Sequence, residues 1–313
     1  MQRPKGLFVM DLDGTLIDRD GVLSDRNRQA MDHAVAAGVA LAIVTGRRRS
    51  TFRAERARLT GLAFRSSVSN GAVLLAGDNE TIERVHAISW QTVQAVWAAL
   101  PENAARACLA VTVPGASDSE QPEPSDAIIM MPDGRFYHAA SPVEPEMQSA
   151  SEEFLLEDHA VVARPLVHAA FHVVDQEMAE PVVEAASRCF GEHATVYVTR
   201  PPRAGGVMVE IVARGGKALA VRDLAASFDV PDEAIAAIGD ELNDIALPRA
   251  ARFRYAMGGL RRTIPALSKS RRLGTIHSGN IVIRVCRCGN RRRQERRICR
   301  SCKTHRSIGT AGR

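Results

Sequence analysis

Residues 6–16 read Gly6-Leu7-Phe8-Val9-Met10-Asp11-Leu12-Asp13-Gly14-Thr15-Leu16. A short apolar run that ends in polar residues is typical of a buried parallel strand, which delivers functional groups at its carboxyl end. Asp11 and Asp13 are two residues apart, so in an extended segment both carboxylates face the same way, and Gly14 lets the chain turn at once. Neighbouring carboxylates repel each other and require a cation or a shared proton. The segment therefore predicts a catalytic or metal-binding strand end.

The same arrangement of strand and polar end returns along the chain. Ser24 is suited to cap the start of a helix and Gly38 to end it, and Val39–Val44 then forms a second apolar strand. Residues 217–228 have a helical pattern, and residues 234–238 are strand-like. Polar residues follow the three strands: Asp11 and Asp13, Thr45-Gly46-Arg47, and Gly239-Asp240-Glu241-Leu242-Asn243-Asp244. This pattern predicts an α/β fold with a doubly wound, Rossmann-like parallel sheet, whose ligands bind at the edge where these strands end.

Residues 79–212 have a different character and predict an inserted α+β cap domain. Helical stretches near 89–100 and 177–189 alternate there with several strand-like runs. The core domain is then expected to consist of residues 1–78 and 213–258, with chain crossings near 77–81 and 213–216 that act as hinges. Residues 114–126 carry almost no apolar side chain and are expected to form a mobile loop. His138, His168 and His172 are candidate substrate contacts of the cap.

The polar strand ends offer the groups that phosphoryl transfer needs. A carboxylate beside Mg²⁺ can attack phosphorus, while a second carboxyl group donates a proton to the leaving oxygen; Asp11 and Asp13 are the candidate pair for these two roles. Asp240 is expected to bind the metal directly, because hard cations prefer carboxylate oxygens. Asp244 is expected to bond a metal-bound water.

Phosphate oxygens need donors and positive charge, and the sequence offers several. Thr45 has a hydroxyl group and Gly46 a backbone amide, Lys217 supplies an ammonium group, and Asn243 could orient the phosphate or the water. Arg47 is a candidate for contact with substrate. Taken singly, each of these residues has an ordinary structural explanation, as a turn or a solvated helix start, and the order of all of them along the chain favours a site.

Together these residues resemble the four motifs of the haloacid dehalogenase (HAD) superfamily of hydrolases. The position of the insert and the phrases Ser69-Asn70-Gly71-Ala72 and Val209-Glu210-Ile211 resemble its Cof-type branch, which has a large α/β cap. The resemblance covers about residues 6–258. It implies a Mg²⁺-dependent phosphatase for sugar phosphates or similar metabolites, with Asp11 as nucleophile and Asp13 as general acid/base. It also implies that Asp240 and the backbone carbonyl of Asp13 join Asp11 on the metal, while Thr45 and Lys217 hold the phosphoryl group.

The resemblance ends after residue 258, where a basic tail begins. Residues 259–313 hold 16 Lys and Arg against one acid, Glu295, whereas residues 1–258 hold 25 Lys and Arg against 35 Asp and Glu. The family's final helix and core strand are not recognisable in this tail, which predicts an open sheet edge. Three explanations remain open: a zinc site, a disordered basic tail, or translation out of frame, which the abrupt change favours. The zinc ligands would be Cys286, Cys288, Cys299 and Cys302.

Composition limits the class of protein. The longest apolar runs fall well short of the roughly 20 residues that a membrane-spanning helix needs, and no secretory signal is recognisable. Cys108 and Cys189 are isolated, which favours a reducing compartment, so we expect a cytoplasmic enzyme with no membrane partner. The expected partner is a small phosphorylated metabolite. The alternatives are a phosphomutase built on the same aspartates and a nucleic-acid-binding protein that acts through its basic tail.

Overall fold

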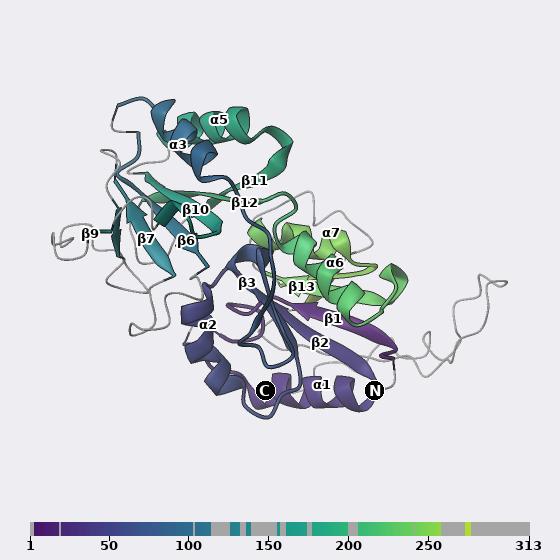
Figure 1. The fold of residues 1–313 in the computed structure, drawn as a ribbon. Coiled ribbons are helices and arrows are strands. Elements are labelled where there is room, and N and C mark those ends of the chain that lie inside the picture. Colours follow the sequence, from purple (N-terminus) through teal and green to yellow (C-terminus); the bar gives the residue numbers. More distant parts are fainter. Residues whose placement is uncertain are drawn as a thin grey trace, which may run out of the picture.

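The computed structural model of the chain contains two sheets, each with its own helices (Figure 1). It describes residues 3–18, 20–102, 104–113, 126–131, 136–138, 155–156, 161–173, 177–199, 206–240, 242–257 and 273–276. Among these residues, no helix has both the length and the hydropathy to cross a lipid bilayer.

The described residues of the core sheet form eight strands, in the order β15-β14-β13-β1-β2-β3-β4-β5. Every pair from β15 to β3 is parallel, and β4 and β5 are antiparallel additions at one edge. In chain order the strands are β1 (Gly6–Met10), β2 (Val39–Val44), β3 (Arg65–Val68), β4 (Val73–Leu75), β5 (Ile82–Val85), β13 (Ile235–Gly239), β14 (Phe253–Met257) and β15 (Leu273–Ile276). The expected doubly wound α/β core is confirmed.

Helices cover both faces of the core sheet, because successive side chains of a strand point to opposite sides. In β1, Phe8 and Met10 join the cluster that packs against α1 and α2, while Leu7 and Val9 join the cluster that packs against α6 and α7. The four helices are α1 (Asp25–Ala36), α2 (Arg49–Arg56), α6 (Lys217–Ser227) and α7 (Ala246–Ala250). Ser24 caps α1 as expected, since its hydroxyl accepts the Asn27 amide hydrogen at 3.2 Å.

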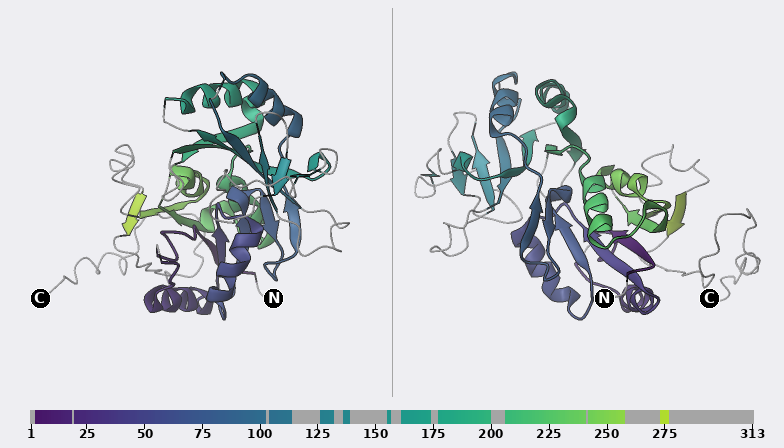
Figure 2. Two further views of the ribbon diagram at one scale, coloured as in Figure 1. Left: turned by 90° about the vertical axis from the view of Figure 1, so that its left-hand side faces the viewer. Right: turned by 45° about the vertical axis from the view of Figure 1, so that its right-hand side comes forward.

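The cap is a second, antiparallel sheet of seven described strands in the order β11-β12-β10-β6-β7-β8-β9. These strands are β6 (Ala107–Thr112), β7 (Ala127–Met130), β8 (Phe136–His138), β9 (Leu155–Leu156), β10 (Leu166–Val173), β11 (Ala194–Thr199) and β12 (Val207–Ala213). Its helices α3 (Trp90–Ala98) and α5 (Ala179–Phe190) lie on the side of the sheet that faces away from the core (Figure 2). The expected inserted α+β cap is thus confirmed.

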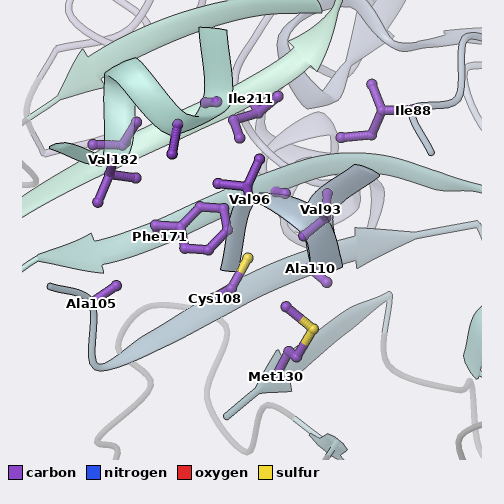
Figure 3. Packing of buried hydrophobic residues seen from close by; sticks show 14 of the residues in the cluster. Ile88, Val93, Val96, Ala105, Cys108, Ala110, Met130, Phe171, Val182 and Ile211 are labelled. Carbon is purple, nitrogen blue, oxygen red and sulfur yellow. The ribbon is translucent and has the colours of Figure 1, made fainter. Parts of the chain in front are cut away.

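The cap has a hydrophobic core of its own between this sheet and helices α3 and α5. Phe171 of β10 lies at its centre, close to Val96 of α3 and Cys108 of β6 (Figure 3). The rings of Phe171 and Trp97 are 5.1 Å apart between centroids. Because the apolar side chains of the cap point toward its helices, the opposite face of the sheet is left to the core domain and its site.

Two features of the core sheet bear on the sequence-based boundaries. Strand β5 lies past residue 78, so we propose to place the crossing into the cap after Val85. Strand β15 pairs in parallel with β14, with Tyr255 opposite Gly274. The expectation that no core strand follows residue 258 was therefore wrong, because a four-residue strand of mixed polarity among arginines carries too little apolar pattern to be recognised. The expected mobile loop at 114–126 lies outside the described residues except for Asp126, which is buried and hydrogen-bonded to Ser50, so the expectation was wrong for that residue. The four tail cysteines lie outside the described residues.

A buried carboxylate of the cap fastens it to the core. Asp126, at the start of β7, accepts hydrogen bonds from the Ser50 amide (2.9 Å) and the Ser50 hydroxyl group (2.7 Å). Arg48 adds an ion pair with Asp126 at 3.1 Å, and both side chains are about nine-tenths buried. Since α2 has no cap from its own Arg48 side chain, the Asp126 carboxylate serves as the N-cap of this core helix. Arg48 directly follows Thr45-Gly46-Arg47, so the contact lies beside a predicted phosphate-binding segment.

We expect Asp126→Ala to loosen the cap. The Arg48 guanidinium group would lose a buried carboxylate partner, which costs about 3 kcal/mol in the free energy of unfolding. The loss should appear in urea unfolding and in faster hydrogen exchange of the Ser50 amide. Asp32→Ala, on the exposed face of α1, is the matched control and should change the stability by less than about 0.5 kcal/mol. Unchanged exchange at Ser50 in Asp126→Ala would contradict the capping role.

Candidate active site

Three carboxylates converge at the carboxyl edge of the core sheet. Strand β1 lies between β13 and β2, and the Asp11 amide donates to the Ile238 carbonyl at 3.0 Å, which sets Asp11 beside the end of β13. One carboxylate oxygen from each of Asp11, Asp240 and Asp244 lies within 4.8 Å of the other two. A group of carboxylate oxygens at this spacing suits a hard divalent cation such as Mg²⁺.

Two glycines allow the carboxylates to come this close. A Cβ atom on Gly14 would lie 2.2 Å from Oδ2 of Asp240, and Gly14 has a φ of +74° that disfavours other residues. A Cβ atom on Gly239 would lie 2.4 Å from the Cβ of Asp244. The Thr15 hydroxyl group donates to Oδ1 of Asp240 at 2.9 Å and fixes that carboxylate. The contacts with Asp240 therefore explain why Gly14 and Thr15 follow Asp13 in the first motif.

Lys217 supplies positive charge to the carboxylates. Its Nζ atom donates to Oδ1 of Asp11 at 2.6 Å and to Oδ1 of Asp244 at 2.5 Å, and its side chain is 2 % exposed. Asp244 also accepts the amide hydrogen of Asp240 at 3.0 Å, through its other oxygen. Both carboxylate oxygens of Asp244 are thus hydrogen-bonded, one to Lys217 and the other to the backbone amide of Asp240. This arrangement suits a role in positioning more than one in direct metal binding.

The pKa values of Asp11 and Lys217 are shifted by burial and by the charges of their neighbours. Burial, and then repulsion from Asp244, raises the pKa of Asp11 well above its usual range, although Lys217 opposes this. Burial would lower the pKa of Lys217, but the charges of Asp11 and Asp244 outweigh it and raise that pKa above its usual range. Three carboxylates against one ammonium group leave two negative charges in a confined place, which a divalent cation would balance.

Asp13 lies apart from this group and is held by Arg47. The guanidinium Nε and Nη2 atoms of Arg47 donate to the two oxygens of Asp13 at 2.8 and 2.6 Å. Arg47 also pairs with Glu55 at 3.1 Å, and its pKa is raised, chiefly by the hydrogen bond with Asp13. The bidentate pair fixes the direction of the Asp13 carboxylate. A contact of Arg47 with substrate stays a prediction.

Thr45 and Gly46 follow β2, the strand adjacent to β1. Thr45 is buried, and its hydroxyl group accepts the amide hydrogen of Arg47 at 3.1 Å. Asn70 supports this turn, because its backbone amide donates to the Thr45 carbonyl at 3.0 Å. Its side chain packs closely on Gly46: a Cβ atom on Gly46 would lie 3.0 Å from Oδ1 of Asn70. Asn243 lies in the 3₁₀ turn Leu242–Ile245, and its side chain is outside the described part of the structure.

A polar group of the cap reaches down to the same turn. Glu210 of β12 accepts a hydrogen bond from Nδ2 of Asn70 at 3.0 Å and one from the Thr199 hydroxyl group. Nε2 of His168 lies 3.1 Å from the same carboxylate. Burial would raise the pKa of Glu210, but the hydrogen bond and charge of His168, the hydrogen bond from Thr199 and the charge of Lys217 outweigh it and lower that pKa. The sequence analysis gave Asn70 and Glu210 no role, although an acid inside the apolar run 207–213 is a signal for a buried polar contact.

The family profile of the haloacid dehalogenase-like hydrolases matches residues 8–269. The chain belongs to this family. The recognition of a HAD hydrolase of the Cof-type branch is confirmed, and the match extends past residue 258, where the sequence analysis ended it.

Solved structures of HAD proteins share the fold. A haloacid dehalogenase-like hydrolase from B. subtilis has a TM-score of 0.60 at 18 % identity, over 88 % of this chain and 95 % of its own. BT1666, a HAD phosphatase from Bacteroides thetaiotaomicron, has a TM-score of 0.62 at 17 % identity, over 88 % and 91 %. BT4131, described as a HAD subclass IIB sugar phosphatase, has 0.58 at 17 %, over 86 % and 93 %. No curated protein sequence matches this chain.

The effect of the contact between Gly14 and Asp240 can be separated from the effect of backbone strain at a glycine with positive φ. Gly14→Ala should displace the Asp240 carboxylate and weaken Mg²⁺ binding by at least about 10-fold, as losses around metal ligands do. Gly61→Ala is the matched control, because Gly61 also has a positive φ (+84°) but has nothing within 4 Å of an added Cβ. It should cost about 1 kcal/mol of stability and leave metal affinity unchanged. Calorimetric titration with MgCl₂ gives both affinities, and equal values for the two variants would refute the contact.

Proposed function

We propose that this HAD hydrolase is a phosphatase that removes phosphate from small phosphorylated metabolites through an aspartyl phosphate at Asp11. The observation that carries the proposal is the convergence of the Asp11, Asp240 and Asp244 carboxylates, two of which, Asp11 and Asp244, bond the buried Lys217. A nucleophile for phosphorus needs its negative charge balanced while an anionic substrate approaches, and this arrangement provides both the nucleophile and the place for a balancing cation.

The residues present suit Mg²⁺. Asp11 and Asp240 would hold the ion directly together with the backbone carbonyl of Asp13, and Asp244 would orient a water bound to it. When bound, Mg²⁺ would neutralise charge on the phosphoryl oxygens and so make phosphorus easier to attack. Thr15 would keep Asp240 in place through the hydrogen bond described above. The carboxylates supply only oxygen atoms, which favours Mg²⁺ over softer metals.

The chain's own residues would carry the reaction in two steps. In the first, an Asp11 carboxylate oxygen attacks phosphorus, the ester P–O bond breaks, and Asp13 gives a proton to the leaving oxygen. In the second, Asp13 takes a proton from water as the water attacks phosphorus, and the Asp11 carboxylate is released together with inorganic phosphate. Arg47 would orient Asp13 for both transfers through its two hydrogen bonds.

The phosphoryl oxygens would be bound by donors from the neighbouring strand ends. Thr45 would donate through its hydroxyl group, Gly46 through its amide, and Lys217 through Nζ, while Asn243 completes the predicted set. For Lys217 this means sharing the ammonium group between Asp11 and the incoming phosphate. Asn70 would hold the Thr45 turn in place through its backbone hydrogen bond, and Glu210 would hold the side chain of Asn70.

The finer substrate class that we propose is a sugar phosphate. The description of BT4131 as a sugar phosphatase supports this choice by likeness of fold. The cap supports it in a second way, because its sheet turns polar residues such as Glu210 and His168 toward the core, where hydroxyl groups of a leaving group would lie. The substrate of this chain is to be found with a panel of sugar phosphates in the presence of Mg²⁺.

The nucleophile is tested by Asp11→Asn. An amide oxygen is a poor nucleophile, so release of inorganic phosphate from p-nitrophenyl phosphate or a hexose phosphate should fall at least about 1000-fold. Asp32→Asn on α1 is the control and should retain full activity. Turnover of Asp11→Asn that equals the wild type would refute the assignment.

The metal requirement is tested by removing divalent cations from the protein and then adding Mg²⁺ back. Treatment with EDTA should stop phosphate release, and MgCl₂ added in excess should restore it, because the charge of the carboxylates then has its counterion again. CaCl₂ serves as the comparison, since Ca²⁺ takes more ligands at longer distances and should restore little activity. Full activity in EDTA would contradict the proposed role of the ion.

A further inference from the structure

One polar side chain of the cap lies at the reaction site without a role in the scheme above. Tyr197 belongs to β11, where it pairs with Glu210 of β12 across the antiparallel ladder, so both side chains project from the same face of the cap sheet. Cap strands alternate between the two faces, and Val196 and Val209, one position away, pack in the apolar core of the cap. Tyr197 therefore points away from the cap helices and toward the core domain.

The hydroxyl group of Tyr197 lies against the start of helix α6. A Cβ atom on Gly216 would be 2.1 Å from this hydroxyl oxygen, and Gly216 has φ and ψ of 49° and −131°, a region that only glycine enters readily. The next residue is Lys217, whose ammonium group binds Asp11 and Asp244. Gly216 thus lets a cap residue approach the segment that delivers the lysine.

This hydroxyl group is buried and has no hydrogen-bond partner among the described residues. Burial raises the pKa of Tyr197 to about 12, so the group is a neutral donor under ordinary conditions. Its charged neighbours in that environment are Lys217, Glu210 and Asp244. A buried hydroxyl group without a partner is unfavourable, and such a group at a reaction site is suited to binding a ligand that accepts its hydrogen bond.

We propose that Tyr197 is a substrate-binding residue, which donates its phenolic hydrogen bond to an oxygen of the phosphate ester held between Asp11 and Lys217. The inference rests on the proposed phosphatase function and assigns a cap residue to the same site. A neutral donor suits this position, because the ester oxygens are acceptors and the lysine beside them already supplies positive charge. On β10, His168 lies opposite Val212 of β12, two residues along from Glu210, and therefore projects from the same face as Tyr197. Its buried Nδ1 atom has no hydrogen-bond partner in the described part of the chain, which makes this face of the cap suited to binding oxygen-rich groups.

The test compares Tyr197→Phe with wild type in the full chain with MgCl₂. Removing only the hydroxyl group should lower kcat/KM by about 10-fold to 100-fold, the effect of a hydrogen bond to a charged partner. The thermal midpoint of the free protein should not fall, because the hydroxyl group has no hydrogen bond to lose among the described residues. Tyr255→Phe is the control, because Tyr255 of β14 packs against the core cluster beneath the sheet and should keep wild-type constants.

Three readouts locate the oxygen that Tyr197 binds. Steady-state kinetics with p-nitrophenyl phosphate and with a hexose 6-phosphate are compared with calorimetric binding of inorganic phosphate. A loss in all three assigns Tyr197 to a phosphoryl oxygen, and a loss confined to the hexose phosphate assigns it to a sugar oxygen; both support the proposal. Equal constants for wild type and Tyr197→Phe in all three would overturn it.

Phosphate binding also separates this proposal from the proposed reaction. If wild type releases no phosphate but binds it more tightly than Tyr197→Phe does, the reaction fails and the Tyr197 contact stands. If wild type is an active phosphatase and Tyr197→Phe matches it throughout, the contact fails and the reaction stands.

Discussion

The structure depends on how charge is balanced at one edge of the core sheet. Asp11, Asp240 and Asp244 come from two strand ends and the turn after one of them, and a single buried ammonium group, that of Lys217, contacts two of them. Like charges repel strongly when water is excluded, so the chain tolerates this arrangement only with a further cation or with a proton in place. The raised pKa of Asp11 expresses the same demand. The proposed function follows from this demand, because a site that binds a cation beside the proposed nucleophile is prepared for an anionic substrate.

The fold meets this demand with a rigid base and a second domain above it. Parallel pairing of β1 with β2 and β13 fixes the three strand ends, and glycines at 14 and 239 remove the side chains that would keep the acids apart. The cap then contributes contacts of its own: Asp126 caps a core helix, Glu210 supports the Thr45 turn, and Tyr197 reaches the lysine segment. Each cap contact ends next to a predicted catalytic or phosphate-binding segment, so cap position and site geometry are coupled.

The sequence predicted the parts of this structure that local pattern encodes. Strand β1 is apolar and ends in a rare spacing of acids, and α1 carries its own cap and stop signals. Strand β3 was missed because Ser66 and Ser67 look exposed in sequence, whereas their hydroxyl groups bond Asn79 and the Val73 carbonyl in the interior. Asp126 and Tyr197 were missed for another reason: their partners are about 76 and 19 positions away, and only tertiary structure brings them together.

The central claim is that Asp11 and Asp240 share one divalent cation. Anomalous diffraction from crystals grown with Mn²⁺, which substitutes for Mg²⁺ at oxygen ligands, tests it without reference to any substrate. We predict a single strong peak at the carboxyl edge of the core sheet, in direct contact with carboxylate oxygens of both residues and close to Asp244. A peak bound elsewhere, or no peak while Lys217 keeps its contacts with Asp11 and Asp244, would contradict the account.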